Sequence, residues 1–406
     1  MTATKTPAFH KPPLFTRQQL IALLLPLIAE QALSVTIGLA DTLMVSSVGE
    51  AAVSGVSLVD SFNTLMIQIM SALATGGAVV TSQYIGRQEP RDARNAAAQI
   101  LFILSSFSLL VAAVVVVGRH AILQGIFGSI DADVMHYAET YFLLSALSYP
   151  FIGLYNAGAA LFRAQGNSKI SMMSSLVMNV VNIGGNAVLI YGFKMGVMGA
   201  ALASLVSRAI ACAVVLYLLQ KPDCALRVDS LRAMAPNGGL IRRILRVGIP
   251  AGIENGMFQI GKLSVSSLTS TLGTAAIAAN AVANTTTTFL NIPANRFAVS
   301  LFNLSPEAQA MALDIMVWFN IVSLFVWPSS FTLPNILRAA GDARFTMTVS
   351  IVSMWTFRVG FCYLAVLCFG GGLLSIWMGM YLDWVFRSLC FYLRFRRGSW
   401  LEQSVI

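Results

Sequence analysis

The sequence predicts an all-α polytopic membrane protein made of two pseudo-symmetric helical lobes. Hydrophobic residues make up 57 % of the chain and charged residues only 11 %, whereas a soluble domain has about 25 % charged residues. Several charge-poor runs have the length of about 20 residues that crosses a bilayer as a helix. A third observation, an N-terminal stretch that recurs in the second half of the chain, predicts the two lobes.

The first predicted helix, residues 20–42, combines a proline with two carboxylates. Pro26 removes one backbone hydrogen bond and allows a bend, so we expect a hinge there. Glu30 follows one turn later, and Asp41 comes eleven residues after Glu30 in a run of mostly small and apolar residues. A carboxylate at membrane depth is costly and usually marks an ion pathway or a proton site. The helix therefore predicts a titratable group and a hinge in one element.

The same stretch occurs a second time, 224 residues later. The offset relates three pairs of residues: Pro26 and Pro250, Glu30 and Glu254, and Gly49 and Gly273. The position of Asp41 is occupied by Val265 in the second copy. A membrane protein with two similar halves is typical of secondary transporters built from internal repeats. Pro250 is thus the predicted hinge of the second lobe.

The remaining charge-poor stretches give the order of the helices. The first lobe, 20–219, is predicted to contain six helices: 20–42, 52–83, 96–117, 137–162, 170–191 and 197–219. A polar linker, 220–246, precedes the second lobe, 247–393, whose predicted elements are 247–271, 274–293, 308–336, 345–369 and 373–393. Residues 1–19 and 394–406 are predicted to be cytoplasmic tails.

Basic residues predict the orientation of these helices. With the N-terminus inside, the inner segments carry nineteen Lys or Arg residues and the outer segments three, namely Arg119, Lys194 and Arg296. Because basic loops stay on the cytoplasmic side, both termini are predicted to be cytoplasmic. We expect the protein in the inner (plasma) membrane, with the lipid bilayer as its surroundings.

The second lobe is shorter than the first. The motif RAQG at Arg163 recurs as RAAG at Arg338, an offset of 175 rather than 224, so 49 residues have no counterpart. The missing piece corresponds to about 70–118, which is the inner part of the second helix and all of the third. The second lobe should therefore have four full helices and one broken helix, 274–293, which turns back at residues 291–293.

The composition argues against other classes of protein. The basic residues lie in short loops and orient helices, so no nucleic-acid partner is implied. The three histidines are scattered and the five cysteines lie mostly in apolar runs, so we expect no metal site, no cofactor and no disulfide framework. No nucleophile–base cluster or phosphate-binding loop is present, so no catalytic residue is predicted and the chain is not expected to be an enzyme.

Several motifs resemble the multidrug and toxin extrusion (MATE) family. They are ADTLMVSSVG, VTSQYIGRQ, LFRAQGNSK, MNVVNIGGNAVLIYG, GVMGAALASLVSR and, at the start of the second half, VGIPAGIEN. The resemblance covers nearly the whole chain and is nearest to the DNA-damage-inducible and flavin-exporting bacterial branch. It implies two six-helix lobes around a cleft that opens alternately to each side. It also implies export of organic cations, as small-molecule substrates, in exchange for protons or sodium ions.

The resemblance also assigns candidate residues. Asp41 matches the family's coupling aspartate and Asn182 its helix 5 asparagine, while Asn186 stands where some relatives have a second aspartate. These three are the predicted ion-coupling residues. Asn156 matches a polar position of the fourth helix, so it is a candidate for the cleft.

Other polar residues leave alternatives open. Glu30 and Glu254 either line the floor of the cleft or pack against backbone donors freed at their prolines. Asp60 is a further cleft candidate, with a capped or hydrated carboxylate as the alternative. A structural role is also open for each asparagine, since amides bond ordinary helix pairs. Asp383 and Arg387 are four residues apart, as a helical ion pair requires.

The predicted function is a monomeric secondary antiporter that exports amphipathic or cationic organic compounds, such as drugs and possibly flavins. One alternative is a flippase of the same superfamily that moves lipid-linked precursors. A flippase would favour an Arg-lined cavity, whereas the charges within the predicted spans are mostly acidic. Another alternative is a truncated remnant that does not transport.

Overall fold

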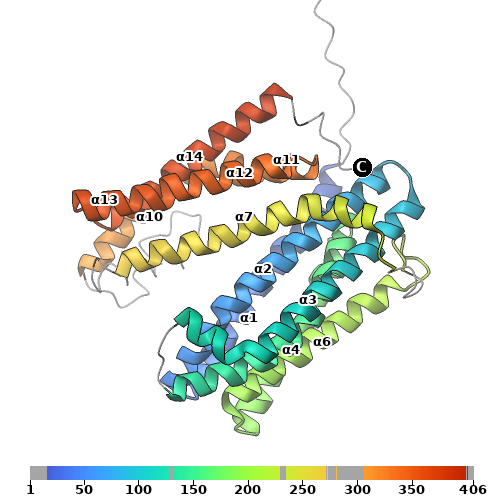
Figure 1. Ribbon diagram of the computed structural model, residues 1–406, viewed down its shortest axis with the longest axis horizontal. Helices are drawn as coiled ribbons and strands as arrows, with labels where there is room; N and C mark the ends of the chain where they lie inside the picture. The colour runs from blue at the N-terminus through green and yellow to red at the C-terminus, as the bar shows by residue number, and fades with distance from the viewer. Residues whose placement is uncertain are drawn as a thin grey trace, which may run out of the picture. The chain divides into compact units, whose positions relative to one another are not determined.

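The computed structural model confirms the all-helical fold class. It describes residues 16–127, 132–228, 235–270, 272, 280, 306–398 and 400, and within these ranges the regular structure is helical throughout (Figure 1). The predicted broken helix 274–293, with its turn at 291–293, lies almost wholly outside the described residues.

The chain forms two compact units. The first comprises residues 1–59 and 107–227, and the second comprises 60–106 and 228–406. Segment 60–106 thus belongs with the second half of the chain, whereas the sequence placed it in the first lobe. The predicted lobes at 20–219 and 247–393 stay a prediction.

The helices extend beyond the predicted apolar runs at most of their ends. Those of the first half are α1 (Arg17–Ser46), α2 (Glu50–Gly86), α3 (Pro90–Phe127), α4 (Ala132–Ala164), α5 (Ser168–Asn186) and α6 (Gly196–Leu219). Those of the second half are α7 (Gly238–Ser270), α10 (Pro306–Trp327), α11 (Leu333–Ala339), α12 (Ala343–Ser353), α13 (Phe361–Phe369) and α14 (Leu373–Arg397). Polar turns prolong these helices because a helix need not end where its hydrophobic segment does.

The start of α7 shows why a predicted boundary was displaced. The helix begins at Gly238, inside the segment expected to be a linker. Asn237 caps it, because its side-chain oxygen accepts hydrogen bonds from the backbone N–H groups of Gly239 (3.1 Å) and Leu240 (3.2 Å). Gln99 of α3 fixes this cap by bonding the backbone N–H of Asn237 at 3.0 Å.

Within the described residues, three of the predicted helices contain π-helical segments. They are η1 (Ala187–Gly192) after α5, η3 (Pro328–Thr332) between α10 and α11, and η4 (Met354–Gly360) between α12 and α13. A π-helical turn widens the backbone and is often found at functional sites. Hydrophobic periodicity does not reveal such turns, so the sequence predicted uninterrupted helices.

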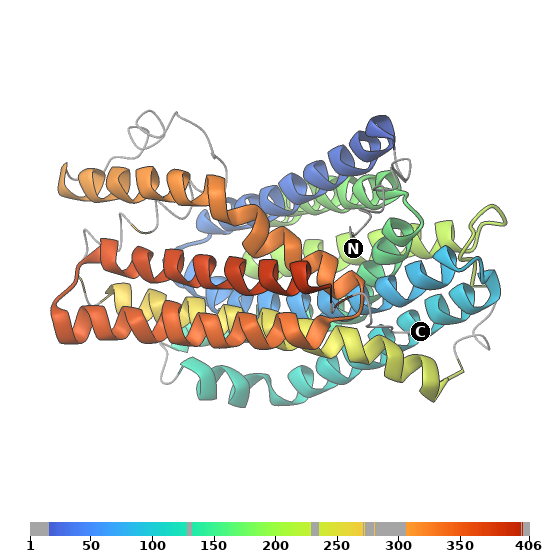
Figure 2. The same ribbon diagram turned by 90° about the horizontal axis from the view of Figure 1, so that it is seen from above.

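In the first unit, α5 lies between α1 and α6, and α4 packs along α6. Figure 2 shows α1 running beside α5. Small residues bring α4 and α6 together: a Cβ atom on Gly158 would lie 2.1 Å from a methyl group of Val215. This packing holds the carboxylate-bearing helix α1 against the asparagine-bearing helix α5.

In the second unit, α7 packs against α12 and η4, and α10 packs against α14. The contact between α10 and α14 is aromatic, with Phe319 lying edge-on to both Trp377 and Trp384. On its other side α7 meets the unit's part of α2, where Gly76 faces Gly248.

Six of the described helical stretches are long and apolar enough to cross a membrane. They are Ala51–Gly86, Pro90–Ile126, Ser168–Gly192, Gly196–Leu219, Ala310–Ala339 and Ala343–Phe369. Their outer surfaces carry exposed large side chains such as Leu110, Val117 and Leu367. These features confirm a multi-pass membrane protein, because exposed apolar side chains of this size need lipid around them.

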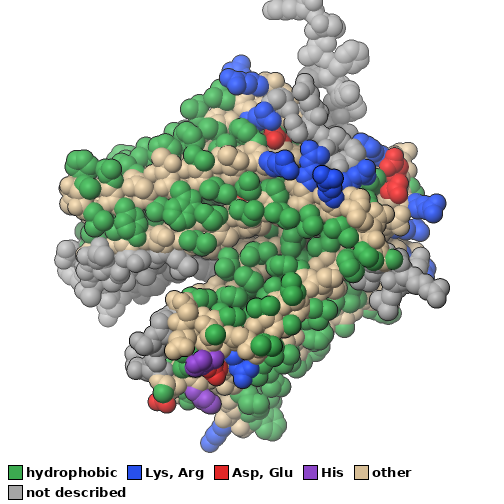
Figure 3. Space-filling model, in the orientation of Figure 1, with side chains coloured by type: hydrophobic (Ala, Val, Ile, Leu, Met, Phe, Trp, Pro, Cys, Tyr) green, Lys and Arg blue, Asp and Glu red, His purple; other side chains and the backbone are tan. Residues whose placement is uncertain are grey.

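The basic helix ends of the second unit lie on one side. Gln83 at the end of α2 donates to the carbonyl of Ala339 at the end of α11 (2.9 Å), and Arg394 of α14 bonds Asp342 before α12 (2.8 Å). Arg243 near the start of α7 bonds the hydroxyl of Tyr84 in α2. Figure 3 shows hydrophobic side chains along the surfaces of the helices. The predicted inner loops of this unit are therefore neighbours in space.

We predict that Gly76→Ala destabilises the protein, because its Cβ atom would lie 2.5 Å from the backbone nitrogen of Gly248. Forcing a methyl group into a closely packed contact costs about 1–3 kcal/mol. The measurement is the melting temperature of the purified protein. Gly86→Ala in the same helix is the control, since a Cβ atom there meets nothing within 4 Å. Equal melting temperatures for the two variants would contradict the close contact.

Candidate functional site

The carboxylate of Asp41 is bound by a buried amide in the first unit. The Nδ2 atom of Asn186 donates to Oδ1 of Asp41 at 2.5 Å. Asp41 lies in the last part of α1 and is partly buried, whereas Asn186 is fully buried. Asn186 is the last residue of α5, directly before the π-helical segment η1. The backbone geometry therefore changes at the residue that holds the carboxylate.

A second asparagine supports this contact. Asn182 lies one turn before Asn186, and its Oδ1 atom accepts from Nδ2 of Asn186 at 3.5 Å. Asn182 in turn donates to the hydroxyl of Ser204 on α6 at 3.1 Å. A polar chain thus runs from α1 through α5 to α6. Asn179 is not in this chain, because its amide bonds the backbone carbonyl of Ser175 at 2.9 Å.

The two other predicted cleft residues are Asn156 and Asp60. Asn156 on α4 is partly buried, and its Nδ2 atom has no hydrogen-bond acceptor within the described part of the chain. Asp60 belongs to the second unit and accepts a hydrogen bond from Asn63 at 3.2 Å. The cleft roles of Asn156 and Asp60 stay predictions.

Glu30 is held by an arginine and a serine. Its Oε1 atom lies 2.9 Å from NH1 of Arg163, at the end of α4, and its Oε2 atom accepts from the hydroxyl of Ser171 on α5 at 2.6 Å. The same nitrogen of Arg163 also donates to Ser171 at 3.1 Å. Three elements of the first unit are thereby joined at one carboxylate.

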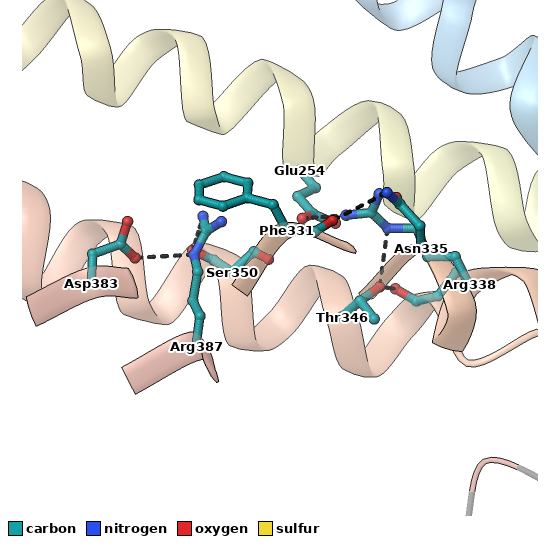
Figure 4. A network of polar contacts seen from close by, with 9 residues as sticks. Glu254, Phe331, Asn335, Arg338, Thr346, Ser350, Asp383 and Arg387 are labelled. Carbon is teal, nitrogen blue, oxygen red and sulfur yellow. Dashed lines mark hydrogen bonds and ion pairs between the residues drawn. The ribbon is translucent and has the colours of Figure 1, made fainter. Parts of the chain in front are cut away.

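The second unit contains a related arrangement, in which a glutamate again pairs with an arginine (Figure 4). Glu254 on α7 lies 2.6 Å from NH2 of Arg338, at the end of α11. Arg338 also donates to Asn335 (3.0 Å) and, through Nε, to the hydroxyl of Thr346 on α12 (3.4 Å). Thr346 is the counterpart of Ser171 at the offset of 175 that relates Arg338 to Arg163. The repeat in the sequence is therefore also a repeat of side-chain contacts.

These contacts answer a question that the sequence left open. Glu30 and Glu254 do not rely on backbone donors freed at Pro26 and Pro250, because each has an arginine partner. Sequence reasoning missed those arginines, although the recurrence of RAQG and RAAG was a signal for them. A direct role of either glutamate in binding substrate stays a prediction.

The predicted hinges lie inside continuous helices. Pro26 lies within α1 and Pro250 within α7, and neither helix is divided at its proline. In both helices the paired glutamate follows its proline by one turn. The bending of either helix stays a prediction.

Asp383 forms a buried cluster with two arginines in the second unit. Nε of Arg387 lies 3.0 Å from Asp383, which confirms the predicted helical ion pair, and NH1 of Arg358 lies 3.9 Å away. The hydroxyl of Ser353 donates to Asp383 at 2.5 Å. In this cluster two buried arginines face one aspartate, so the local charge is basic although most charges predicted within the spans are acidic.

The described residues contain no group of three or more His, Cys, Asp or Glu side chains that could hold a metal ion. The polar groups brought together are instead carboxylates with amide, hydroxyl or guanidinium donors. Such a set can bind and release a proton or bind a monovalent cation, and it can position a charged solute. The fold and this chemistry define a multi-pass helical membrane protein with carboxylates held by buried polar groups.

Comparisons with known proteins agree with this class. The MatE family matches residues 26–188. The uncharacterised transporter YisQ of Bacillus subtilis is 25 % identical, with 100 % of this chain and 98 % of YisQ covered. The probable multidrug resistance protein NorM of Thermotoga maritima is 23 % identical, covering 96 % of this chain and 94 % of NorM.

A solved structure shares the fold. It is a MOP superfamily transporter from Pyrococcus furiosus, described as having a binding pocket of reversed polarity, with a TM-score of 0.84 and 19 % identity over 95 % of this chain and 97 % of that one. The chain is thus similar to the MatE family over residues 26–188 and to multidrug resistance proteins over nearly its whole length. The alignment with YisQ extends over 457 positions against 406 residues here, a difference of 51, so at least that many of its positions have no residue of this chain.

We predict that Glu254→Gln destabilises the protein more than Glu30→Gln does. The side chains of Glu254 and Arg338 are 9 % and 20 % exposed, against 15 % and 32 % for Glu30 and Arg163. Removing one partner of a buried ion pair costs about 3–5 kcal/mol, and solvent reduces that loss where the pair is more exposed.

Thermal unfolding of the purified variants measures this difference. Glu89→Gln is the control, because Glu89 is exposed between α2 and α3. The opposite order of the two melting temperatures would show that burial does not set the strength of the pairs.

Proposed function

We propose that the protein is a secondary antiporter that exports amphipathic or cationic organic compounds in exchange for protons or sodium ions. The observation that carries the proposal is the carboxylate of Asp41, held at 2.5 Å by the buried amide of Asn186. Multidrug resistance proteins among the relatives support the class of substrate. Drugs are the substrates that this likeness favours, and flavins are a further candidate.

Asp41 is proposed to bind the coupling ion. An ionised carboxylate can take up a proton or a sodium ion, and its charge within the membrane is then neutralised. An organic cation would favour the ionised form instead, so the two ligands compete. Competition at one carboxylate couples the downhill entry of the ion to the uphill exit of the substrate.

Asn182 and Asn186 are proposed to position this carboxylate. The amide N–H of Asn186 is a donor to Asp41, and Asn182 fixes the amide orientation by accepting from the same nitrogen. A carboxylate held in one place presents the same geometry to each incoming ion. Pro26, fifteen residues earlier in α1, is the proposed point where the helix bends when the charge of Asp41 changes.

We further propose that the protein is a monomer in the inner membrane with both termini cytoplasmic. The excess of Lys and Arg in the predicted inner loops supports this orientation. The contacts that join the basic ends of α2, α7, α11 and α14 also support it.

We predict that Asp41→Asn abolishes gradient-driven export, because the amide cannot exchange a proton or neutralise a sodium ion. The measurement is efflux of ethidium from proteoliposomes under an imposed proton or sodium gradient. Asp314→Asn is the matched control, since Asp314 is an exposed carboxylate on α10. Wild-type rates of pumping by Asp41→Asn would exclude Asp41 as the coupling site.

We predict that Asn186→Ala moves the pH profile of transport toward higher pH. The lost donor stabilises the ionised carboxylate, so its loss favours the protonated form. A hydrogen bond of this kind contributes on the order of 0.6 kcal/mol, equivalent to about half a pH unit. Efflux measured from pH 5 to 9 tests the shift.

Asn179→Ala is the control for this shift, because the amide of Asn179 bonds Ser175 rather than the chain that reaches Asp41. An unchanged profile in Asn186→Ala, or an equal shift in Asn179→Ala, would leave Asn186 as a packing residue.

A further inference from the structure

We propose that the second unit contains a binding site for the anionic group of an amphipathic aromatic molecule, built around Arg358 and Arg387. This inference deepens the proposed function by naming a class of substrate, an aromatic anion. It rests on the proposed function only for the transport of that substrate. The binding site itself stands on contacts within the second unit.

The first observation is an unbalanced charge. Arg358 and Arg387 are 12 % and 5 % exposed at their side chains, and Asp383 is fully buried. Among the described residues, Asp383 is the one carboxylate that acts electrostatically on Arg358, while Arg387 opposes it. Two buried cations with one buried anion leave one positive charge, and buried charges require a partner.

The second observation is that the two arginines make different contacts. Asp383 contacts Arg387 at 3.0 Å, and Arg387 also donates to the carbonyl of Ser350 at 3.4 Å. Arg358 is 3.9 Å from Asp383, which is too long for a hydrogen bond. Its NH1 atom has no acceptor in the described part of the chain. Nε of Arg387 also lacks a hydrogen-bond acceptor within the described residues. Arg358 differs from Arg387 in its greater distance from Asp383 and its more exposed side chain.

The third observation is the aromatic surface around both cations. The guanidinium carbon of Arg358 lies 5.1 Å from the ring centre of Phe258, and that of Arg387 lies 5.7 Å from the rings of Phe258 and Phe331. Figure 4 shows the ring of Phe331 beside the guanidinium group of Arg387. These cation–π contacts hold the guanidinium groups in place without neutralising them.

The backbone supports such a site. Arg358 lies in the π-helical segment η4 and Phe331 in η3, so both come from widened turns. Gly261 on α7 lets that helix approach η4, because a Cβ atom there would lie 2.4 Å from Met354. Lys262 follows Phe258 by four residues on α7, which places a further cation on about the same face.

Together these features select the ligand. A guanidinium with free N–H groups pairs best with a carboxylate or another oxyanion, and the surrounding rings favour an aromatic body. The site should therefore prefer an aromatic carboxylate over a neutral or cationic compound with the same ring. Zwitterionic amphipaths with a carboxylate are included in this class.

The test uses the full chain in lipid nanodiscs and three probes with one ring system: 1-naphthoate, 1-naphthamide and 1-naphthyltrimethylammonium. Titration calorimetry measures equilibrium binding, with empty nanodiscs subtracted. We expect 1-naphthoate to bind at least tenfold more tightly than 1-naphthamide. Equal affinities for the anion and the amide would overturn the proposal without any variant.

Arg358→Gln should remove this preference, whereas Arg208→Gln should keep it. Arg208 is a matched control because it is a partly buried arginine in the first unit, bonded to Ser148 at 2.6 Å. Full retention of the preference by Arg358→Gln would exclude the site.

If Arg358→Gln does not fold, Asp383→Asn provides a second test of the anion site. Removal of the one carboxylate raises the surplus positive charge, so 1-naphthoate should bind more tightly and raise the melting temperature further than in the wild type. Weaker binding of 1-naphthoate to Asp383→Asn would contradict the charge argument.

Asp41→Asn separates this proposal from the proposed function. Asp41 belongs to the first unit, so its variant should lose gradient-driven efflux and keep the preference for 1-naphthoate. If the wild-type protein binds the anion but shows no ion-driven export, the antiporter proposal is wrong and the anion site stands. If it exports but does not prefer the anion, the anion site is wrong and the antiporter proposal stands.

Discussion

The cost of a charge inside the membrane is the constraint on which the rest of the structure depends. Four carboxylates within the described helices have a donor close to them: Asn186 for Asp41, Arg163 for Glu30, Arg338 for Glu254 and Arg387 for Asp383. Because such a donor must come from another helix or from the next turn, these pairs fix which helices are neighbours. Charge pairing thus sets the packing as much as apolar contact does.

The two Glu–Arg–hydroxyl networks are the part of this design that repeats. Both join a proline-containing helix to the end of a later helix and to the helix that follows it. Both pairs are neutral overall, so they hold helices together without adding charge to the membrane. This balance suits a structural role for Glu30 and Glu254 at positions near the predicted hinges.

The two units differ in the charge of their central polar residues. The polar chain of the first unit ends at a carboxylate, Asp41, whereas the cluster of the second unit has a surplus guanidinium, Arg358. The repeat that produced the two halves therefore does not extend to their polar centres. Such divergence is expected if the paired glutamates serve the common fold while the central residues serve the ligands.

The sequence by itself determined the fold class, the internal repeat and the candidates Asp41, Asn182 and Asn186. Charge-poor runs and a constant offset are local patterns, and a residue's own neighbours in the chain are enough to reveal them. Local pattern also predicted the Asp383–Arg387 pair, since four residues make one helical turn.

Only the tertiary structure decided which helix supplies each partner. Arg163 and Glu30 are 133 residues apart, and Arg338 and Glu254 are 84 apart, so no spacing rule relates them. The π-helical turns and the burial of Arg358 were likewise hidden, because hydrophobic periodicity reports the face of a helix and not its local pitch. Many residues could pair with each charge, and the packing of helices distant in the sequence determines which of them comes into contact.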